Sequence, residues 1–410
     1  MTDDRELPAP DASLAAPDDF ETEPAQALSP PGRGLGEGAR TSTIIADSEP
    51  PHPNPLPPGE RELVEPTSHR GLTYPWGHRT PEQGDLIEIA PGVGWARLPV
   101  PGSLKHINVW ALDDDEGVAL VDTGLNIPVA REAWEALFAG PLAGRTVTRV
   151  ICTHFHPDHI GLAGWLCERF GVRLWMTRGE WLFARMLTLD VRDAPPPEAA
   201  AAQRAAGWSE ERIEADKAKG WGRFASAVSP VPISIVRMQD GDVIAIGDRT
   251  WRVVTGNGHS PEHACLVDDE GGVMIAGDQV LPRITSNVSL SLSEPEGDPL
   301  GDWLTSIDKL KGLDADLLVL PSHGEPFTGL HARLDVLAKG HHGRLDALVK
   351  RLAEPKRAVD CFPILFGRAI DDSVYGLATG EAMAHLRHLE VTGRASKEVS
   401  GGVFWYRAAA

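Results

Sequence analysis

Three histidines and an aspartate lie within six residues of one another, in the stretch THFHPDHIG at residues 153–161. His154 and His156 are two positions apart at the end of a predicted strand, so in extended backbone both side chains point the same way and form a chelating pair. Asp158 and His159 begin the next predicted helix and project toward a slightly displaced point. Imidazole nitrogens and carboxylate oxygens are common ligands of divalent metals. The spacing therefore favours two neighbouring metal ions over one.

Three later residues repeat this placement. His259 in TGNGHSPEH, Asp278 in IAGDQVLP and His323 in LPSHGEPF each follow an apolar, strand-like run and precede a turn. Any one of them alone would more often be an ordinary surface residue. Because all three share the strand-end placement of the first cluster, we expect the fold to bring them to the same edge.

The order of these motifs is HxHxDH, then a GHS histidine, a GD aspartate and an SHG histidine, and it resembles the metallo-β-lactamase-fold superfamily of metallohydrolases over about residues 85–328. The resemblance implies two metal sites that share Asp278 as a bridging ligand. The other implied ligands are His154, His156 and His259 for the first metal and Asp158, His159 and His323 for the second. Asp122 in LVDTG is similar to the superfamily's buried aspartate, which orients ligands. The alternative for Asp122 is a turn residue that caps the following segment.

The resemblance also implies the chemistry. A hydroxide between two divalent ions acts as the nucleophile, because bound metal lowers the pKa of water to near neutral. Asp158 is the candidate catalytic residue that orients this nucleophile or receives its proton. Zinc is the default metal, and a ligand set of nitrogen and oxygen without sulfur suits iron or manganese as well.

The ligand set, with aspartate at position 278, is similar to that of the glyoxalase II group, lactonases, phosphodiesterases and certain ribonucleases, and it disfavours antibiotic hydrolysis. The first hypothesis is a hydrolase of a small thioester, ester or lactone. A phosphodiesterase or endoribonuclease is the alternative, and an iron oxidoreductase of the same fold is a third. Arg283 and Asn287 in LPRITSNVSL either bind an anionic group of the small-molecule substrate or belong to a turn with local hydrogen bonds.

These residues need a scaffold, and the sequence predicts an α+β fold, a four-layer αββα sandwich over residues 69–328. Short apolar runs closed by turn residues predict antiparallel strands first and then strands interspersed with helices. The expected strands are residues 93–100, 106–114, 117–124, 147–154, 172–177, 242–246, 250–256, 263–269, 272–278 and the run from 317, and the expected helices are 128–138, 161–170 and 300–311. The Ala-rich, helical insert at 178–225 either covers the site or is a solvated excursion.

The apolar pattern of residues 329–410 predicts a winged-helix-like domain, with helices at 330–352 and 380–393 and a terminal hairpin. This part resembles the C-terminal domain of a branch related to the mitochondrial lactamase-like endoribonuclease. Basic residues on the first helix could face nucleic acid, although a solvated helix face has the same pattern. His341 and His342 are expected at the surface. A homodimer is left open, because winged helices also mediate dimerisation.

Composition and charge give expectations for the N-terminal extension, the partners, the localisation and the cysteines. Residues 1–68 hold 13 of the 34 prolines and are expected to be a disordered extension, which a start codon assigned too far upstream could explain. The formal net charge of −20 disfavours nucleic acid as a partner. Since there is no signal peptide and no apolar run of roughly 20 residues, we expect a cytoplasmic protein with no membrane partner. The four widely spaced cysteines suit buried, reduced thiols.

Overall fold

The computed structural model of the 410-residue chain describes residues 65–115 and 117–409. The predicted disorder of the N-terminal extension lies, up to residue 64, outside the described residues. Thr67 and Ser68, at the end of that predicted extension, belong to strand β1 (Thr67–His69), which pairs with β2 (Leu72–Tyr74). The last two residues assigned to the extension on composition therefore belong to a strand.

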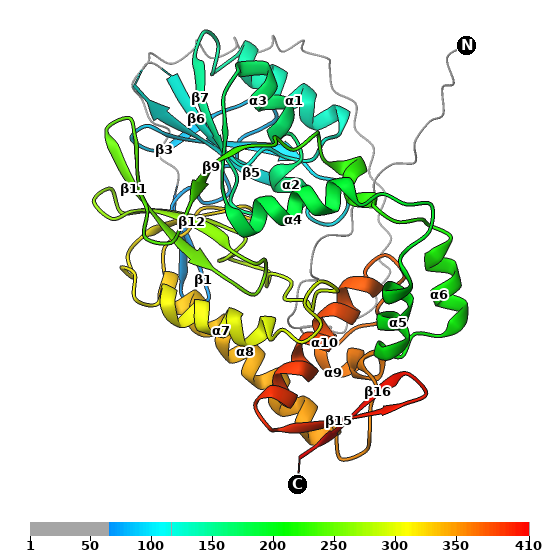
Figure 1. The fold of residues 1–410 in the computed structure, drawn as a ribbon. Coiled ribbons are helices and arrows are strands. Elements are labelled where there is room, and N and C mark those ends of the chain that lie inside the picture. The colour runs from blue at the N-terminus through cyan, green and yellow to red at the C-terminus, as the bar shows by residue number, and fades with distance from the viewer. Residues whose placement is uncertain (1–64, 116, 410) are drawn as a thin grey trace, which may run out of the picture. The chain divides into compact units, whose positions relative to one another are not determined.

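A seven-stranded sheet forms one half of a sandwich (Figure 1). Its strands follow chain order across the sheet, antiparallel up to the fourth strand and parallel from there. They are β3 (Ile87–Ala90), β4 (Val93–Pro99), β5 (His106–Asp114), β6 (Gly117–Val121), β7 (Thr146–Ile151), β8 (Leu174–Thr177) and β9 (Ile235–Met238). The five expected strands are confirmed. The sequence pattern misses β3 and β9, which are short and lie at the two edges of the sheet.

A five-stranded sheet forms the other half, and all of its strands were expected from the sequence. It contains β10 (Val243–Ile246), β11 (Arg249–Gly256), β12 (His263–Asp268), β13 (Val273–Gly277) and β14 (Leu318–Pro321). The first four are antiparallel hairpin neighbours, and β14 runs parallel to β13 after the crossover helix α7 (Pro299–Leu310).

Three hydrophobic cores define four layers. Side chains alternate along each strand, so Trp95 and Trp110 point into the core between the two sheets, while Leu98 and Ile107 point to the outer face of the first sheet. There they pack with helices α1 (Pro128–Ala139), α3 (Ala163–Phe170) and α4 (Arg178–Leu189). The outer face of the second sheet packs with α7 and with helix α8 (Leu330–Arg351). This is the predicted αββα sandwich of the α+β class.

The C-terminal region is mainly helical, as predicted. It consists of α8, α9 (Phe362–Phe366), α10 (Tyr375–Val391) and the hairpin of β15 (Ala395–Ser400) and β16 (Val403–Ala408). His342 is exposed as expected, but the surface position expected for His341 is wrong, since its side chain is 1 % exposed. His341 lies four residues after Leu337 and four before Leu345, in the buried stripe of α8.

The insert at residues 178–225 packs against two parts of the molecule, the first sheet and the C-terminal region. Its first helix, α4, packs on the first sheet, and α5 (Pro197–Ala206) and α6 (Glu210–Lys217) lie beside the C-terminal helices (Figure 1). The indole nitrogen of Trp208, between α5 and α6, donates to the hydroxyl of Thr379 on α10 at 2.9 Å. The insert is therefore a packed part of the fold on both sides.

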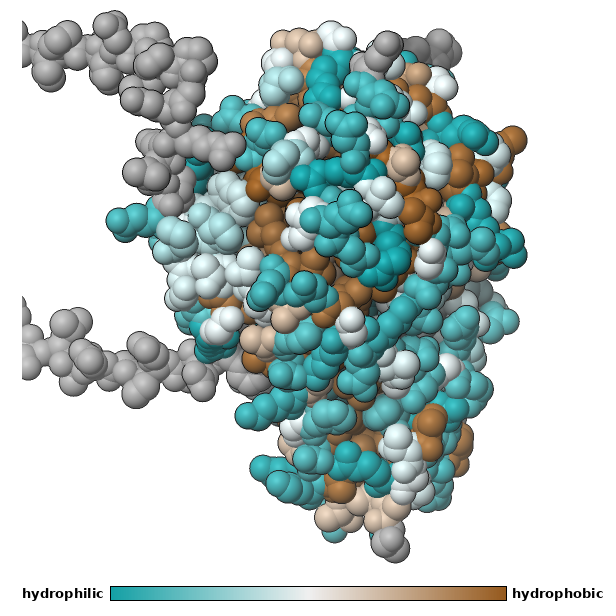
Figure 2. Space-filling model, turned by 90° about the vertical axis from the view of Figure 1, so that its left-hand side faces the viewer, coloured by the Kyte–Doolittle hydropathy of each residue, from teal (hydrophilic) through white to brown (hydrophobic). Residues whose placement is uncertain are grey.

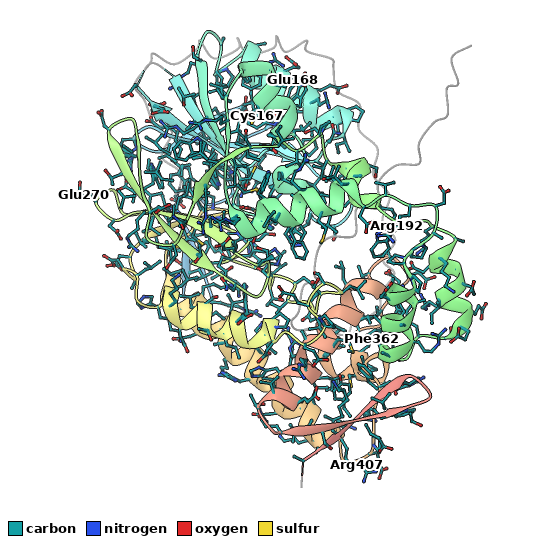
Figure 3. The ribbon with its side chains drawn as sticks, viewed as in Figure 1. Cys167, Glu168, Arg192, Glu270, Phe362 and Arg407 are labelled. Carbon is teal, nitrogen blue, oxygen red and sulfur yellow. The ribbon has the colours of Figure 1, made fainter. Side chains whose placement is uncertain are left out.

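Most charged side chains lie at the surface and most large apolar ones are buried. Among the residues labelled in Figure 3, Glu168, Arg192, Glu270 and Arg407 are exposed, and Cys167 and Phe362 are buried. All four cysteines are buried and free, as predicted. Hydrophilic residues cover most of the face shown in Figure 2. In the part of the chain that the structure describes, no helix combines the length and apolar composition needed to span a membrane.

Candidate metal centre

The expected site residues lie at one edge of the sandwich, just after the carboxyl ends of strands. β6 and β7 are parallel neighbours, so Asp122 and His154, which follow them, lie at the same end of the first sheet. In the second sheet, β13 and β14 are parallel and are followed by Asp278 and His323. β11 runs in the direction of β13, because both pair antiparallel with β12, and it ends shortly before His259. Because of these strand directions, all five residues lie at one edge of the sandwich.

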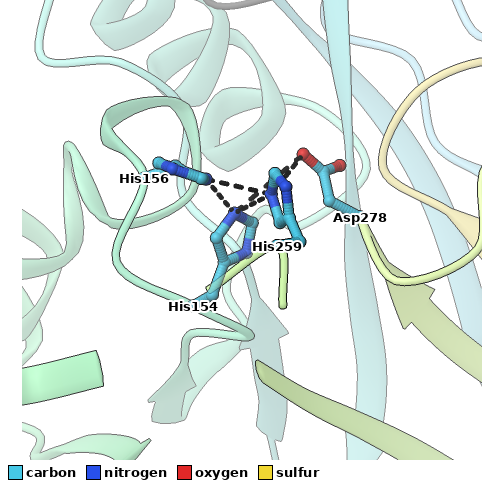
Figure 4. Close-up of side chains that lie close together, drawn as sticks. All are labelled: His154, His156, His259 and Asp278. Atoms are coloured by element: carbon cyan, nitrogen blue, oxygen red, sulfur yellow. Dashed lines mark hydrogen bonds and ion pairs between the residues drawn. The ribbon is translucent and has the colours of Figure 1, made fainter. Parts of the chain in front are cut away.

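Three imidazole nitrogens form the first group (Figure 4). His154 Nε2 is 2.8 Å from His156 Nδ1 and 3.2 Å from His259 Nε2. His156 Nδ1 and His259 Nε2 are 3.0 Å apart. Asp278 Oδ2 lies 3.4 Å from His259 Nε2 and 3.9 Å from His154 Nε2. These four side chains converge on one point, as the ligands of a single cation do.

Asp158, His159 and His323 form the second group. Oδ2 of Asp158 is 3.3 Å from His323 Nε2 and 3.6 Å from His159 Nε2. Asp278 reaches this group too, with Oδ2 at 3.4 Å from His159 Nε2 and Oδ1 at 3.5 Å from His323 Nε2. Asp278 thus lies between the two groups, where the sequence analysis places a bridging ligand.

Hydrogen-bond acceptors behind three of the rings set their orientation. His259 Nδ1 donates to the backbone carbonyl of Asn287 (2.8 Å), and His323 Nδ1 donates to another backbone carbonyl (2.9 Å). His159 Nδ1 donates to the carboxylate of Asp122 (2.8 Å). Since a carbonyl or carboxylate oxygen only accepts, the proton of each neutral ring lies on Nδ1 and the lone pair of Nε2 points into the site.

The donor set fits divalent metal ions. Two buried atoms of the site, His159 Nε2 and Asp278 Oδ1, have no hydrogen-bond partner among the described residues, which is costly unless an ion or another group pairs with them. Burial holds the pKa of His154 well below its usual value and lowers that of His156 to about 3. Both rings are therefore neutral nitrogen donors at neutral pH, the form in which imidazole binds metal.

Carboxylates surround the two rings of the second group. Although burial alone would lower it, the pKa of His159 is raised well above its usual value by Asp122, Asp158 and Asp278. The pKa of His323 is likewise raised by Asp278 and Asp158 against the effect of burial. The same carboxylates would attract a divalent cation placed between the rings. The electrostatic environment of the site therefore favours a bound cation.

Asp122 lies directly behind the site and is fully buried. Besides the bond from His159, it accepts the backbone amide of Thr153 (2.9 Å) and the Thr153 hydroxyl (2.9 Å to Oδ2). The Thr153 hydroxyl in turn lies 3.0 Å from Nδ1 of His154. Asp122 thus contacts one ring directly and a second through Thr153, which favours the orienting role over a simple turn cap.

His263 also supports the site, and the sequence analysis missed it. It is fully buried, and its Nε2 accepts the backbone amide of Asp278 at 3.1 Å. Burial holds the pKa of His263 well below its usual value, so the ring stays neutral and accepts. Its position four residues after His259, in GHSPEH, was the available signal.

The two candidate substrate-binding residues have protein partners. Arg283 Nε lies 2.9 Å from an oxygen of Glu325, and half of the Arg283 side chain is exposed. The side-chain amide of Asn287 donates to Glu381 on α10 at 3.3 Å, and the backbone carbonyl of Asn287 accepts from His259. Arg283 therefore remains accessible to a ligand, whereas Asn287 links the first group to the C-terminal region.

The C-terminal helices hold the loop that follows β13. On α8, Arg333 donates to the carbonyl oxygens of Leu281 (2.5 Å) and Ile284 (2.6 Å). On the α10 side, the amide of Leu290 donates to the carbonyl of Gly380 (3.1 Å). The loop that contributes contacts to both metal-ligand groups is thus fixed from outside the sandwich.

The insert reaches the first group through α4. Phe155 separates two of the candidate ligands in the chain, and its ring lies 5.0 Å from Phe183 of α4 and 6.1 Å from Phe224. These three rings form an apolar wall beside His156. The insert is therefore not a solvated excursion, and its first helix borders the first group.

Comparison with protein families finds matches in two parts of the chain. Residues 102–323 match the metallo-beta-lactamase superfamily, and residues 345–409 match the domain described as "Metallo-beta-lactamase-like, C-terminal domain". The first match ends at His323, the last candidate ligand.

Curated relatives are about a quarter identical to this chain over the aligned residues. The protein named "Probable metallo-hydrolase YqjP" from Bacillus subtilis is 24% identical over 316 residues, which cover 76% of this chain and 96% of the relative. An atrochrysone carboxyl ACP thioesterase from Emericella nidulans is 24% identical, covering 79% and 86%. The human acyl-coenzyme A thioesterase MBLAC2 is 24% identical, covering 47% and 64%.

Solved structures are similar over most of the chain. A beta-lactamase domain protein from Burkholderia ambifaria is 40% identical with a TM-score of 0.74, covering 83% of this chain and 100% of that one. A metallo-beta-lactamase family protein from Thermus thermophilus is 30% identical with a TM-score of 0.66, covering 78% and 100%. With its αββα sandwich, its strand-end histidines and these matches, the chain belongs to the metallo-β-lactamase superfamily and carries a metallo-β-lactamase-like C-terminal domain.

Proposed function

We propose that the protein is a hydrolase that uses two divalent metal ions, with zinc as the first choice, on a small thioester, ester or lactone. The position of Asp278 carries the proposal. Its carboxylate lies within 3.5 Å of ring nitrogens from both groups, His259 in the first and His159 and His323 in the second. A carboxylate shared by two ligand groups suits a pair of ions held close together.

Each side chain has a role in this proposal. His154, His156 and His259 hold the first ion, and Asp158, His159 and His323 hold the second, with Asp278 shared. When bound, the ions supply Lewis-acid activation of a water molecule and of the substrate carbonyl. Although burial alone would raise it, the pKa of Asp158 is lowered by His159 and His323, so this carboxylate is ionised. We assign to it the orientation of the attacking water or the acceptance of its proton.

A thioester is the preferred substrate class. Two of the relatives described above bear thioesterase names, atrochrysone carboxyl ACP thioesterase and acyl-coenzyme A thioesterase, which supports acyl transfer to water as the chemistry. The resemblance of the ligand set to the glyoxalase II group points the same way. The exposed guanidinium of Arg283 is the candidate partner for an anionic group of the substrate.

The domain organisation from the sequence is retained as a proposal. We place the hydrolase domain at residues 69–328 and the C-terminal domain at 329–410, and we interpret the helices and hairpin of the latter as winged-helix-like. Because α8 and α10 hold the loop after β13, we infer that this domain supports the site and does not act as an independent binding module.

A substrate screen with metal analysis tests the function. Purified protein is loaded with zinc, and its metal content is measured before assay against acyl-coenzyme A, acylglutathione and lactone substrates. We expect about two zinc ions per chain and turnover of at least one thioester. Bis(p-nitrophenyl) phosphate and single-stranded RNA serve as substrates for the alternative.

Three results would contradict the proposal. Turnover of RNA or phosphodiesters without any acyl substrate would favour a nuclease. Iron content with oxygen consumption would favour an oxidoreductase. Failure to retain any divalent metal would remove the basis for all three functions.

A further inference from the structure

Glu180 is a buried carboxylate that the proposed chemistry does not use. It lies in the first turn of α4, its side chain is fully buried, and it belongs to neither of the two ligand groups. Removing a carboxylate from water is costly, so a fully buried glutamate requires partners that compensate for lost hydration.

Its partners are donors from two different loops. One oxygen, Oε2, accepts the backbone amide of Phe155 at 2.9 Å. The other, Oε1, accepts the hydroxyl of Ser260 at 2.7 Å and the backbone amide of Glu262 at 2.6 Å. A carboxylate offers acceptors only, so it matches three converging donors, which an amide or a protonated acid matches less well.

Both loops carry candidate ligands of the first metal. Phe155 lies between His154 and His156 in the chain, and Ser260 directly follows His259. These loops are about 100 residues apart in sequence and come from different sheets. A single side chain therefore fixes the distance between the loop with two of the ligands and the loop with the third.

The backbone at the start of α4 strengthens this connection. The amide of Gly179 donates to the side chain of Glu262 at 2.7 Å, and the hydroxyl of Thr177 donates to the Glu262 carbonyl at 2.8 Å. The second loop is thus docked on the helix that presents Glu180. The Glu180 carboxylate is therefore fixed relative to the second loop, and its other oxygen binds the first loop at the Phe155 amide.

We propose that Glu180 is a positioning residue that sets the separation of His154 and His156 from His259 and thereby the affinity and geometry of the first metal site. The inference rests on the proposed metal binding at this site but not on any substrate. Hydrogen bonds behind metal ligands commonly change metal affinity by about 10–100-fold when they are removed.

Glu180→Gln is the informative variant. Glutamine has the same shape, but its NH2 group would face either the Phe155 amide or the donors on the second loop. Two donors then oppose each other, and one loop must shift away. We expect zinc to bind the first site about 10-fold or more weakly in competition with a chromophoric chelator. In cobalt-loaded protein, we expect a changed visible spectrum, because that spectrum reports ligand geometry.

Asp114→Asn is the matched control. Asp114 is also a buried carboxylate with three donors, the Thr148 hydroxyl, the Gly247 amide and the Arg149 guanidinium. It lies at the start of the β5–β6 turn, at the opposite end of β6 from the site. This variant should lower the melting temperature of the metal-free protein while leaving zinc affinity and the cobalt spectrum unchanged.

Ser260→Ala provides a second test if Glu180→Gln does not fold. It removes one donor and retains the carboxylate, so we expect a smaller loss of zinc affinity in the same direction, about threefold. Unchanged zinc affinity and cobalt spectra in the variants at 180 and 260 would overturn the proposal, and so would equal losses in Asp114→Asn. Native protein that binds no metal would instead overturn the proposed function.

Discussion

The protonation of each site histidine depends on what lies behind its ring. A carbonyl behind His259 and another behind His323 keep the proton on Nδ1, so the opposite nitrogen is free to bind a cation. Behind His159 lies a carboxylate, Asp122, which holds the ring more strongly. Ligand residues alone therefore do not define the site, because their partners decide which atom faces the metal.

His156→Ala tests the first group at the residue scale. Loss of one of three imidazoles should empty that group, so we expect bound zinc to fall from about two ions to about one and turnover to fall by more than about 100-fold. Metal content is measured by atomic emission and turnover with the best acyl substrate. His342→Ala, on the exposed side of α8, is the control and should change neither value. Full metal content in His156→Ala would contradict the assignment.

At the scale of elements, the loop after β13 connects the two parts of the molecule. It starts at Asp278, passes the backbone carbonyl that accepts from His259, and is bound by Arg333 of α8 and by Gly380 of α10. Arg333 is mostly buried, and burial lowers its pKa to about 10, which leaves it charged at neutral pH. Its guanidinium replaces the water that these loop carbonyls would otherwise require.

Arg333→Met tests this connection. The methionine fills most of the space but leaves the carbonyls of Leu281 and Ile284 without their donor, so we expect a loss of about 1–3 kcal/mol in the free energy of unfolding. Because the loop holds His259, we also expect faster zinc release to a chelator. Arg394→Met, which breaks a surface ion pair with Asp346, should cost less than about 1 kcal/mol and leave zinc release unchanged. Equal zinc release in both variants would show that the loop does not depend on Arg333.

At the scale of the whole molecule, buried histidines join the C-terminal helices. His341 of α8 and His385 of α10 are both buried, and their ring nitrogens are 3.3 Å apart. Burial lowers the pKa of His385 to about 4, and burial with the nearby His385 holds that of His341 well below its usual value. Both rings are neutral in the folded protein and become protonated on unfolding below about pH 6.5.

This predicts acid sensitivity of the C-terminal region. A histidine with a lowered pKa in the folded state stabilises fully above about pH 6.5, and its contribution falls as pH drops toward about 4, by up to about 1.4 kcal/mol per pH unit. His385→Gln should therefore reduce the difference in unfolding free energy between pH 7.5 and pH 5.5, measured with urea on metal-free protein. His342→Gln, exposed on the same helix as His341, should keep the wild-type difference. An unchanged difference in His385→Gln would contradict the prediction.

Much of the fold could be predicted because its signals are local. Alternation along β4 and β5 gives strands with two buried faces, and the leucine stripe gives α8. The edge strands β3 and β9 were missed, because four residues at a sheet edge carry little pattern. His341 is buried although histidine is a polar residue, because it occupies a position of the leucine stripe on α8.

The sequence by itself determined the ligand types and their strand-end placement, because a chelating HxHxDH cluster and its later partners are written in short, contiguous motifs. Only the tertiary structure decided how these motifs are held against one another. Glu180 and Arg333 act through hydrogen bonds to backbone groups far away in the chain, and a backbone amide or carbonyl has the same chemistry at every residue. Such contacts leave no trace in local composition, so they appear only when the two sheets and the C-terminal helices are packed together.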